Sequence, residues 1–158
     1  MLFPLFVWLQ RTYLAETIRH SAFLIATLEI VHLVGMTLLL GTILMIDLSV
    51  LGRGIAGYPA ARIARELRRW TLAGLALMLA SGPLILISEA ERCYHTPAFW
   101  IKMALLAAAL AFYFTIHQRT VVEAAETRGG AKFAAVISLA LWTGVALAGK
   151  AIAIFQPA

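Results

Sequence analysis

The stretch SAFLIATLEIVHLVGMTLLLGTILMIDLSV, residues 21–50, decides the fold class of this chain. Most of its side chains are apolar, and its ionisable residues are Glu29, His32 and Asp47. About 20 apolar residues in an α-helix cross the hydrocarbon core of a bilayer, and a helix leaves few backbone polar groups unpaired in lipid. The stretch therefore predicts a membrane-spanning helix that is long enough to tilt or to protrude.

Working outward from this helix, three further segments are long and apolar enough to span a membrane: residues 70–88, 97–117 and 133–155. In the whole chain 62% of residues are hydrophobic and 13% are charged, against about 45–50% and about 25% in soluble domains. A soluble protein of 158 residues could not bury so much apolar surface. We expect an all-α protein, a four-transmembrane-helix bundle that forms a single integral membrane domain over residues 1–158.

The beginning of the chain, MLFPLFVWLQ, is apolar but does not have the features of a cleaved signal peptide. It has no basic residue, and no small-residue cleavage motif follows before Arg11. The aromatic rings of Phe3, Phe6 and Trp8 are typical of segments that lie at the membrane–water interface. We expect a retained, short N-terminal interfacial segment.

The linker before residue 70 has a pattern of its own. Ile63, Leu67 and Trp70 recur at helical spacing, with arginines on the other face, and Pro59 suits the start of a helix. We expect an N-terminal extension of the second span that lies along the headgroups. A docking surface for a cytoplasmic partner is the alternative.

The basic residues are distributed unequally between the two sides of the membrane, and the positive-inside rule places the richer side in the cytoplasm. We therefore expect a multi-pass protein of the bacterial inner (cytoplasmic) membrane with both termini on the periplasmic side. The net charge of +5 then reflects orientation and does not indicate a nucleic-acid partner. The richer side has Arg53, Arg62, Arg65, Arg68, Arg69, Arg119, Arg128 and Lys132, and the other side has Arg11, Arg19 and Arg92.

Ionisable residues inside spans are the most informative about function, because each costs about 2.5–3.5 kcal/mol at the bilayer centre and usually faces the bundle interior. Glu29 and His32 are three residues apart and share one helix face in the outer half of the first span. Lys102 and Lys150 each lie five residues from the outer end of their spans. Residues 81–83, Ser-Gly-Pro, lie in the outer half of the second span, where proline loosens the helix. Each of the four predicted spans thus has a polar residue or a proline kink at a similar depth in the outer half of the membrane.

Each of these residues also has a purely structural interpretation. Glu29 and Lys102 would form a buried ion pair that determines helix register, and Lys150 would extend to the outer headgroups. His32 is equally compatible with a hydrogen-bonded packing residue and with an axial ligand. We expect Asp47 to cap its helix or to pair with a linker arginine. Three histidines near span ends are expected to be interfacial residues rather than ligands: His20, His95 and His117.

A helical bundle in a membrane with an inward histidine is typical of b-type haem proteins. In the hypothesis that we favour, the chain is an electron-transfer module that binds haem b in the outer half of the bundle. His32 is the axial ligand, Glu29 belongs to the same site, and the haem propionates are held by Lys102, Lys150 and Arg19. The sequence does not identify a second ligand, because His117 lies roughly 30 Å from the outer edge and His32 about half as far. Met36 and Met103 are closer in depth, although Met36 shares the helix of His32.

Three other functions stay open. A copper-related metal site could use His32 with His20 or His95. Glu, His and Lys inside a bundle could also pass protons or a solute. A cofactor-free accessory or scaffold subunit of a larger membrane complex would contact other subunits, or a second copy, through small residues: Gly35, Gly41, Gly144 and Gly149. The pattern identifies no catalytic residue, and whether the chain is an enzyme stays open.

Four stretches carry a resemblance to a family: LEIVHLVG (28–35), GTILMIDLSVLG (41–52), FWIKM (99–103) and SLALWTGVALAGKAIA (138–153). They resemble an uncharacterised family of bacterial four-helix membrane proteins, a domain of unknown function that is distantly similar to CopD-type copper-resistance and cytochrome-b-like membrane domains. The resemblance extends from Trp8 to Ala153 and favours copper or haem without deciding between them. It implies that the signature positions of the family are Glu29, His32, Asp47, Lys102, Trp142 and Lys150.

Overall fold

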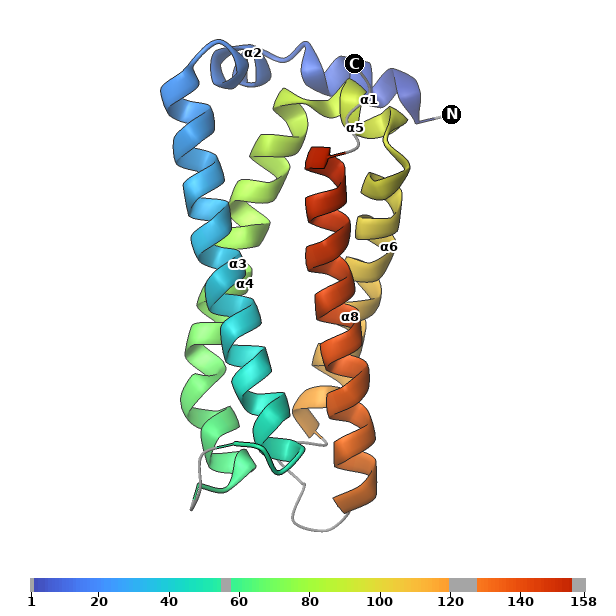
Figure 1. The fold of residues 1–158 in the computed structure, drawn as a ribbon. Coiled ribbons are helices and arrows are strands. Elements are labelled where there is room, and N and C mark those ends of the chain that lie inside the picture. The colour runs from blue at the N-terminus through green and yellow to red at the C-terminus, as the bar shows by residue number, and fades with distance from the viewer. Residues whose placement is uncertain (1, 55–57, 120–127, 155–158) are drawn as a thin grey trace.

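The computed structural model describes residues 2–54, 58–119 and 128–154, and helices make up nearly all of these ranges (Figure 1). Four helical segments are long and apolar enough to cross a membrane. They are α3 (Ala22–Val50), α4 (Ala60–Ser88), α6 (Pro97–Phe112) with its π-helical continuation η1 (Tyr113–His117), and α8 (Arg128–Ile154). The predicted all-α bundle of four membrane-spanning helices is confirmed, and the chain is a multi-pass membrane protein.

The four long helices are arranged as two antiparallel pairs (Figure 1). α3 packs most extensively on α4, and α6 packs on α8, while α3 and α8 form a smaller contact between the pairs. Two glycines bring α3 and α4 close together. A Cβ on Gly35 would lie 2.8 Å from the Cβ of Leu77, and a Cβ on Gly74 would lie 2.7 Å from the backbone nitrogen of Leu39. No side chain fits at such distances, so this helix crossing requires glycine.

The glycines that were expected to contact other subunits lie mainly against other helices of this chain. Gly35 faces α4, Gly144 faces the side chain of Leu105, and Gly149 faces the side chain of Lys102. A Cβ added to Gly41 would meet no described atom within 4 Å. Three of the four glycines therefore serve the internal packing of this chain.

Replacing Gly74 with alanine is expected to destabilise the bundle by about 1–3 kcal/mol, because the added methyl group would push α3 away from α4. The matched control is Gly41→Ala on α3, which is expected to be neutral or stabilising by up to about 1 kcal/mol because alanine favours a helix. Unfolding in mixed micelles, followed by circular dichroism, measures both effects. Equal effects of the two substitutions would contradict the close helix crossing.

Three short helices lie across one end of the bundle (Figure 1): α1 (Phe3–Gln10), α2 (Tyr13–Arg19) and α5 (Ala90–His95). Phe6 of α1 is buried, and its ring lies 5.3 Å from that of Tyr94 and 6.0 Å from that of Phe99 between centroids. Trp8 on the same helix is exposed. The ring of Phe3 also lies 5.3 Å from that of Tyr94. The predicted N-terminal segment is therefore confirmed as a short helix, and it packs on the bundle end through the aromatic rings of Phe3 and Phe6.

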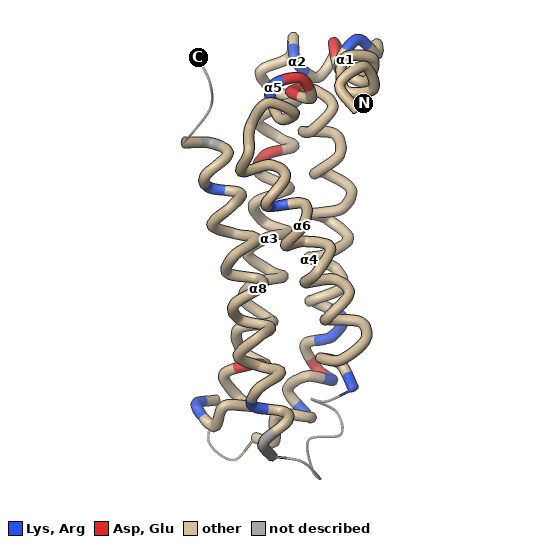
Figure 2. The backbone as a smooth tube through the Cα atoms, turned by 90° about the vertical axis from the view of Figure 1, so that its right-hand side faces the viewer, with Lys and Arg blue, Asp and Glu red and all other residues tan. Residues whose placement is uncertain are grey.

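Most basic residues lie at the opposite end, which we call the arginine-rich end (Figure 2). The predicted linker helix is part of α4, which begins at Ala60 and has arginines along its first turns. This extension continues the course of the second span as part of one helix (Figure 1). Similarly, α8 begins at Arg128 rather than at residue 133, and the predicted end of this span at residue 155 lies outside the described residues.

Pro83 changes the course of α4 near α5. Proline has no N–H to donate to the carbonyl group of the preceding turn, and its ring crowds that turn. Figure 1 shows the last turns of α4 leaning away from α3. The two helices that touch at Gly35 and Gly74 therefore diverge toward this end of the bundle, which leaves space inside the bundle.

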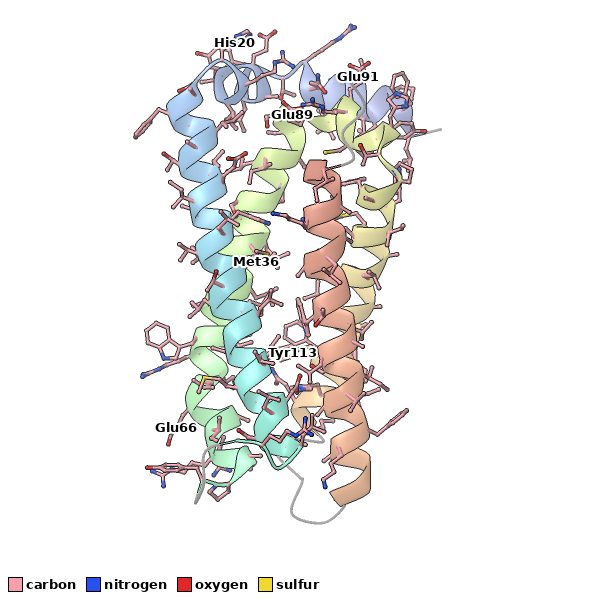
Figure 3. All side chains as sticks on the ribbon, viewed as in Figure 1. His20, Met36, Glu66, Glu89, Glu91 and Tyr113 are labelled. Carbon is pink, nitrogen blue, oxygen red and sulfur yellow. The ribbon has the colours of Figure 1, made fainter. Side chains whose placement is uncertain are left out.

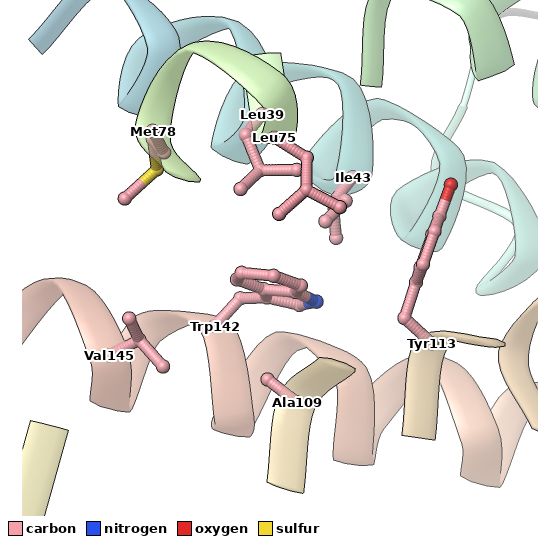
Figure 4. Packing of buried hydrophobic residues seen from close by; sticks show 8 residues of the cluster. All are labelled: Leu39, Ile43, Leu75, Met78, Ala109, Tyr113, Trp142 and Val145. Atoms are coloured by element: carbon pink, nitrogen blue, oxygen red, sulfur yellow. The ribbon is translucent and has the colours of Figure 1, made fainter. Parts of the chain in front are cut away.

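An apolar cluster fills the bundle between this space and the arginine-rich end (Figure 4). Trp142 projects from α8 toward Leu39, Ile43 and Leu75 on the other helix pair, and its side chain is buried. The remaining members of the cluster are Met78, Ala109, Tyr113 and Val145. The cluster joins the two helix pairs and closes the space above it from the arginine-rich end.

Candidate functional site

Two adjoining cavities lie between the helix pairs, in the half of the bundle nearer α1, α2 and α5. Their volumes are about 320 Å³ and about 490 Å³, within the range of about 300–1,000 Å³ that is usual for small-molecule sites. We call the two together the histidine cavity. The residues that line both parts are His32, Leu33, Leu39, Met78, Lys102 and Gly149.

His32 lines this cavity, and one of its ring nitrogens has no hydrogen-bond partner among the described residues. Its Nδ1 atom lies 2.9 Å from the hydroxyl oxygen of Ser81, and that hydroxyl group donates its own hydrogen to the carbonyl oxygen of Leu77 at 2.7 Å. A hydroxyl group has a single hydrogen, so Ser81 must accept from His32, and the neutral imidazole has its hydrogen on Nδ1. Nε2 is then left with its lone pair, which is the arrangement typical of a histidine that binds a metal through one nitrogen.

Lys102 reaches into the cavity from α6 and crosses α8 at a glycine. A Cβ on Gly149 would lie 3.5 Å from Lys102 Nζ, so the absence of a side chain there makes room for the ammonium group. Among the described residues, no hydrogen bond or ion pair involves Lys102, although the residue is partly buried. An ammonium group in an apolar cavity is costly without an anion, so the cavity favours an anionic ligand group.

The other predicted site residues differ in whether they line the histidine cavity. Glu29 is exposed and lines only the larger part of the cavity, and Lys150 is exposed and lines the smaller part. The predicted buried ion pair between Glu29 and Lys102 is wrong, because the described residues form no such pair and Glu29 is exposed. Arg19 is in α2 and lines neither part of the cavity.

The structure does not bring His20 and His95 together with His32 as metal ligands. Figure 3 shows His20 at the end of the bundle, whereas Met36 lies well within it. The ring of His95 contacts that of Phe3, with 5.3 Å between centroids. In the described ranges, no three His, Cys, Asp or Glu side chains form a group that could hold a metal ion. Cys93 lines the larger part of the cavity, but burial and nearby Glu89 raise the pKa of its thiol, which makes it a poor ligand.

A second polar pair, which the sequence did not predict, lies near the arginine-rich end. His117 Nε2 donates to Asp47 Oδ1 at 2.6 Å, and both side chains are almost completely buried. Asp47 was expected to cap its helix or to pair with a linker arginine, and its side chain instead pairs with His117 inside the bundle. Tyr113 stacks on His117 with 5.6 Å between ring centroids. The two partners are 70 residues apart, so no local pattern in the sequence indicates that they meet.

Sequence reasoning also missed two features of the histidine cavity itself. Met78 lines both parts of it, yet in the sequence it is one apolar residue among many in its span. Ser81 was noted only as a polar residue in the same layer, and its role as the partner of His32 depends on how α3 and α4 are rotated. The low hydropathy of Ser81 inside an apolar span is the signal that could have suggested a hydrogen-bond partner.

Comparison with known proteins identifies a family for this chain. Residues 5–155 match a family model described as a family of unknown function, DUF6644. No curated protein and no solved structure matches the chain. The matched region contains the histidine cavity and the Asp47–His117 pair, and it confirms the expected membership of an uncharacterised family. Because the match covers nearly the whole chain, this protein belongs to the DUF6644 family of unknown function.

Proposed function

We propose that the chain is a membrane-embedded module that binds haem b in the histidine cavity and transfers electrons. One observation carries the proposal: the same cavity contains an imidazole with a free Nε2 and a lysine without an anionic partner among the described residues. Haem requires both kinds of group, a nitrogen ligand for its iron and cations for its two propionates.

Each residue has a defined part in this proposal. His32 would ligate the iron through Nε2, which makes no hydrogen bond to Ser81. Lys102 and Lys150 line the smaller part of the cavity together and would pair with the propionates. A sixth ligand could come from a thioether on a helix other than α3, and Met78 of α4 is the candidate that lines both parts of the cavity.

Haem bound in this way supplies one-electron transfer at its iron. The protein holds the group, orients it and keeps water away from it. The cavity walls are mainly apolar, and Trp142 lies at the border between the cavity and the packed core. Because the cavity lies in the half of the bundle nearer α1 and α2, an electron partner would dock on that side, which the distribution of arginines predicts to be periplasmic.

The proposal predicts a haem spectrum for the purified full-length protein. Expressed in haem-replete cells and isolated in detergent, it is expected to show a Soret band when oxidised and α and β bands after reduction with dithionite. Titration of the apoprotein with haemin is expected to reproduce these bands with a saturable, stoichiometric end point. A featureless visible spectrum together with non-saturable haemin uptake would contradict haem binding.

A further inference from the structure

A third cavity lies at the arginine-rich end and has no part in the haem proposal. Its volume is about 200 Å³, and its walls come from α3, α4, η1 and the residue that follows η1. Its polar lining consists of groups that can donate hydrogen bonds, and no acidic residue belongs to the described lining. These lining residues include Arg65, Arg68, Tyr113, His117 and Gln118.

Arg65 and Arg68 are one turn apart on α4 and are exposed. Within the described part of the chain, neither makes a hydrogen bond, an ion pair or a contact with an aromatic ring. The flanking arginines of the same helix differ in this respect. Arg62 pairs with Glu66 at 2.9 Å, and the guanidinium group of Arg69 lies over an aromatic ring at 5.5 Å. The two arginines that line the cavity are therefore the ones available to a ligand.

Gln118 adds a neutral donor to the same cavity. Its Nε2 atom is buried and has no hydrogen-bond partner among the described residues. Buried polar groups in proteins usually have a partner, so an acceptor is expected at this position. Guanidinium and amide groups together require a ligand that offers several oxygen atoms with negative charge.

The carboxylate beside this cavity does not neutralise the arginines. Asp47 Oδ1 accepts the hydrogen bond from His117 Nε2, and Asp47 is not part of the cavity lining. The stacked rings of Tyr113 and His117 form one wall. The cavity consequently combines positive charge and donors with apolar surface from Ile46.

We propose that this cavity binds the phosphate headgroup of an anionic phospholipid. Arginine suits a phosphate because its planar guanidinium group donates two parallel hydrogen bonds. Basic pockets between spanning helices on the cytoplasmic side are typical sites for anionic headgroups, and the positive-inside rule predicts that side for this end. The apolar wall at Ile46 would contact the glycerol and upper acyl region. This inference does not depend on haem binding.

The test compares phosphatidylglycerol with phosphatidylcholine of the same acyl chains, added to the full-length protein in neutral detergent. Native mass spectrometry is expected to show retained phosphatidylglycerol and little phosphatidylcholine. The double substitution Arg65→Gln/Arg68→Gln is expected to weaken phosphatidylglycerol binding about tenfold or more. The matched control Arg62→Gln/Arg69→Gln removes the same charge from the same helix and is expected to change binding about twofold or less.

Two further measurements distinguish a specific phospholipid site from non-specific attraction between arginines and anionic lipid. Gln118→Leu leaves the charge unchanged and is expected to weaken phosphatidylglycerol binding severalfold, whereas an unchanged affinity would contradict the part assigned to Gln118. Inorganic phosphate is expected to compete only weakly, and complete displacement without a preference for phosphatidylglycerol would identify the free anion as the ligand. Equal losses in the two double variants, or no loss in Arg65→Gln/Arg68→Gln, would overturn the proposal.

Discussion

The substitution His32→Ala is expected to reduce the haem content of the purified protein to background. His32 is the histidine that lines the histidine cavity, and alanine offers no nitrogen to the iron. Ser81→Ala removes only the acceptor that holds the hydrogen on Nδ1, and it is expected to weaken haem binding by about tenfold with a shifted reduction potential. Reduced-minus-oxidised spectra and a pyridine haemochrome assay measure both results.

The controls for this prediction are the two exposed histidines at the end of the bundle. His20→Ala and His95→Ala remove an imidazole of the same kind but lie outside the lining of the cavity, so both variants are expected to retain haem. Circular dichroism of each variant confirms that the bundle is folded. A full haem complement in folded His32→Ala protein would exclude His32 as the ligand and leave the cavity without a function for its free nitrogen.

The buried pair of Asp47 and His117 is expected to make the largest contribution of any single polar contact to stability. His117→Leu removes the one hydrogen-bond donor that the described part of the chain offers to the carboxylate, and Asp47 Oδ2 has no partner there. Breaking a buried pair in this way costs about 3–5 kcal/mol. Unfolding in mixed micelles, followed by circular dichroism, is expected to show a loss of this size.

The double substitution Asp47→Val/His117→Leu removes both partners and is expected to be more stable than His117→Leu alone, because no unpaired charge stays buried. The matched control is the neutral hydrogen bond of 2.9 Å between Thr71 and Thr42, whose loss in Thr71→Val is expected to cost about 1 kcal/mol. Additive losses in the double variant would show that the two residues do not act as a pair.

The two ends of the bundle differ in chemistry, and the apolar cluster separates them. One half contains a histidine, lysines and a cavity that suits a large amphipathic ligand. The other half contains a buried hydrogen-bonded pair of aspartate and histidine and a small basic cavity. The packed region around Trp142 lies between them, so a ligand at either end can be removed or mutated without direct contact with the other.

Most of the fold could be predicted from the sequence, because the requirements that a bilayer sets for each helix depend on that segment alone. A bilayer requires long apolar segments with internally paired backbone groups, and each such segment can be recognised without knowledge of its neighbours. The boundaries were less well predicted where a helix continues into water. The first turns of α4 are amphipathic and rich in arginine, so hydropathy alone placed the start of this span at residue 70. The helical spacing after Pro59 was needed to predict the extension that the structure shows from Ala60.

For the candidate site, the sequence predicted only how far along its span each polar residue lies. Counting along the spans placed His32, Lys102 and Lys150 at a similar level, and the structure brings these three to one cavity. The same counting paired Glu29 with Lys102, whereas the described residues form no such pair and Ser81 is the partner of His32. Depth follows from the rise per residue, but the direction of a side chain around the helix axis does not.

The sequence by itself therefore determined the class, the number of spans and the depth of each polar group. Only the tertiary structure decided which polar groups meet: Ser81 with His32, and Asp47 with His117. The physical reason is that α3 is apolar on all sides, so no hydrophobic stripe specifies which face turns inward. Its rotation is determined instead by the close contact of Gly35 with Gly74 and by the divergence of α4 after Pro83.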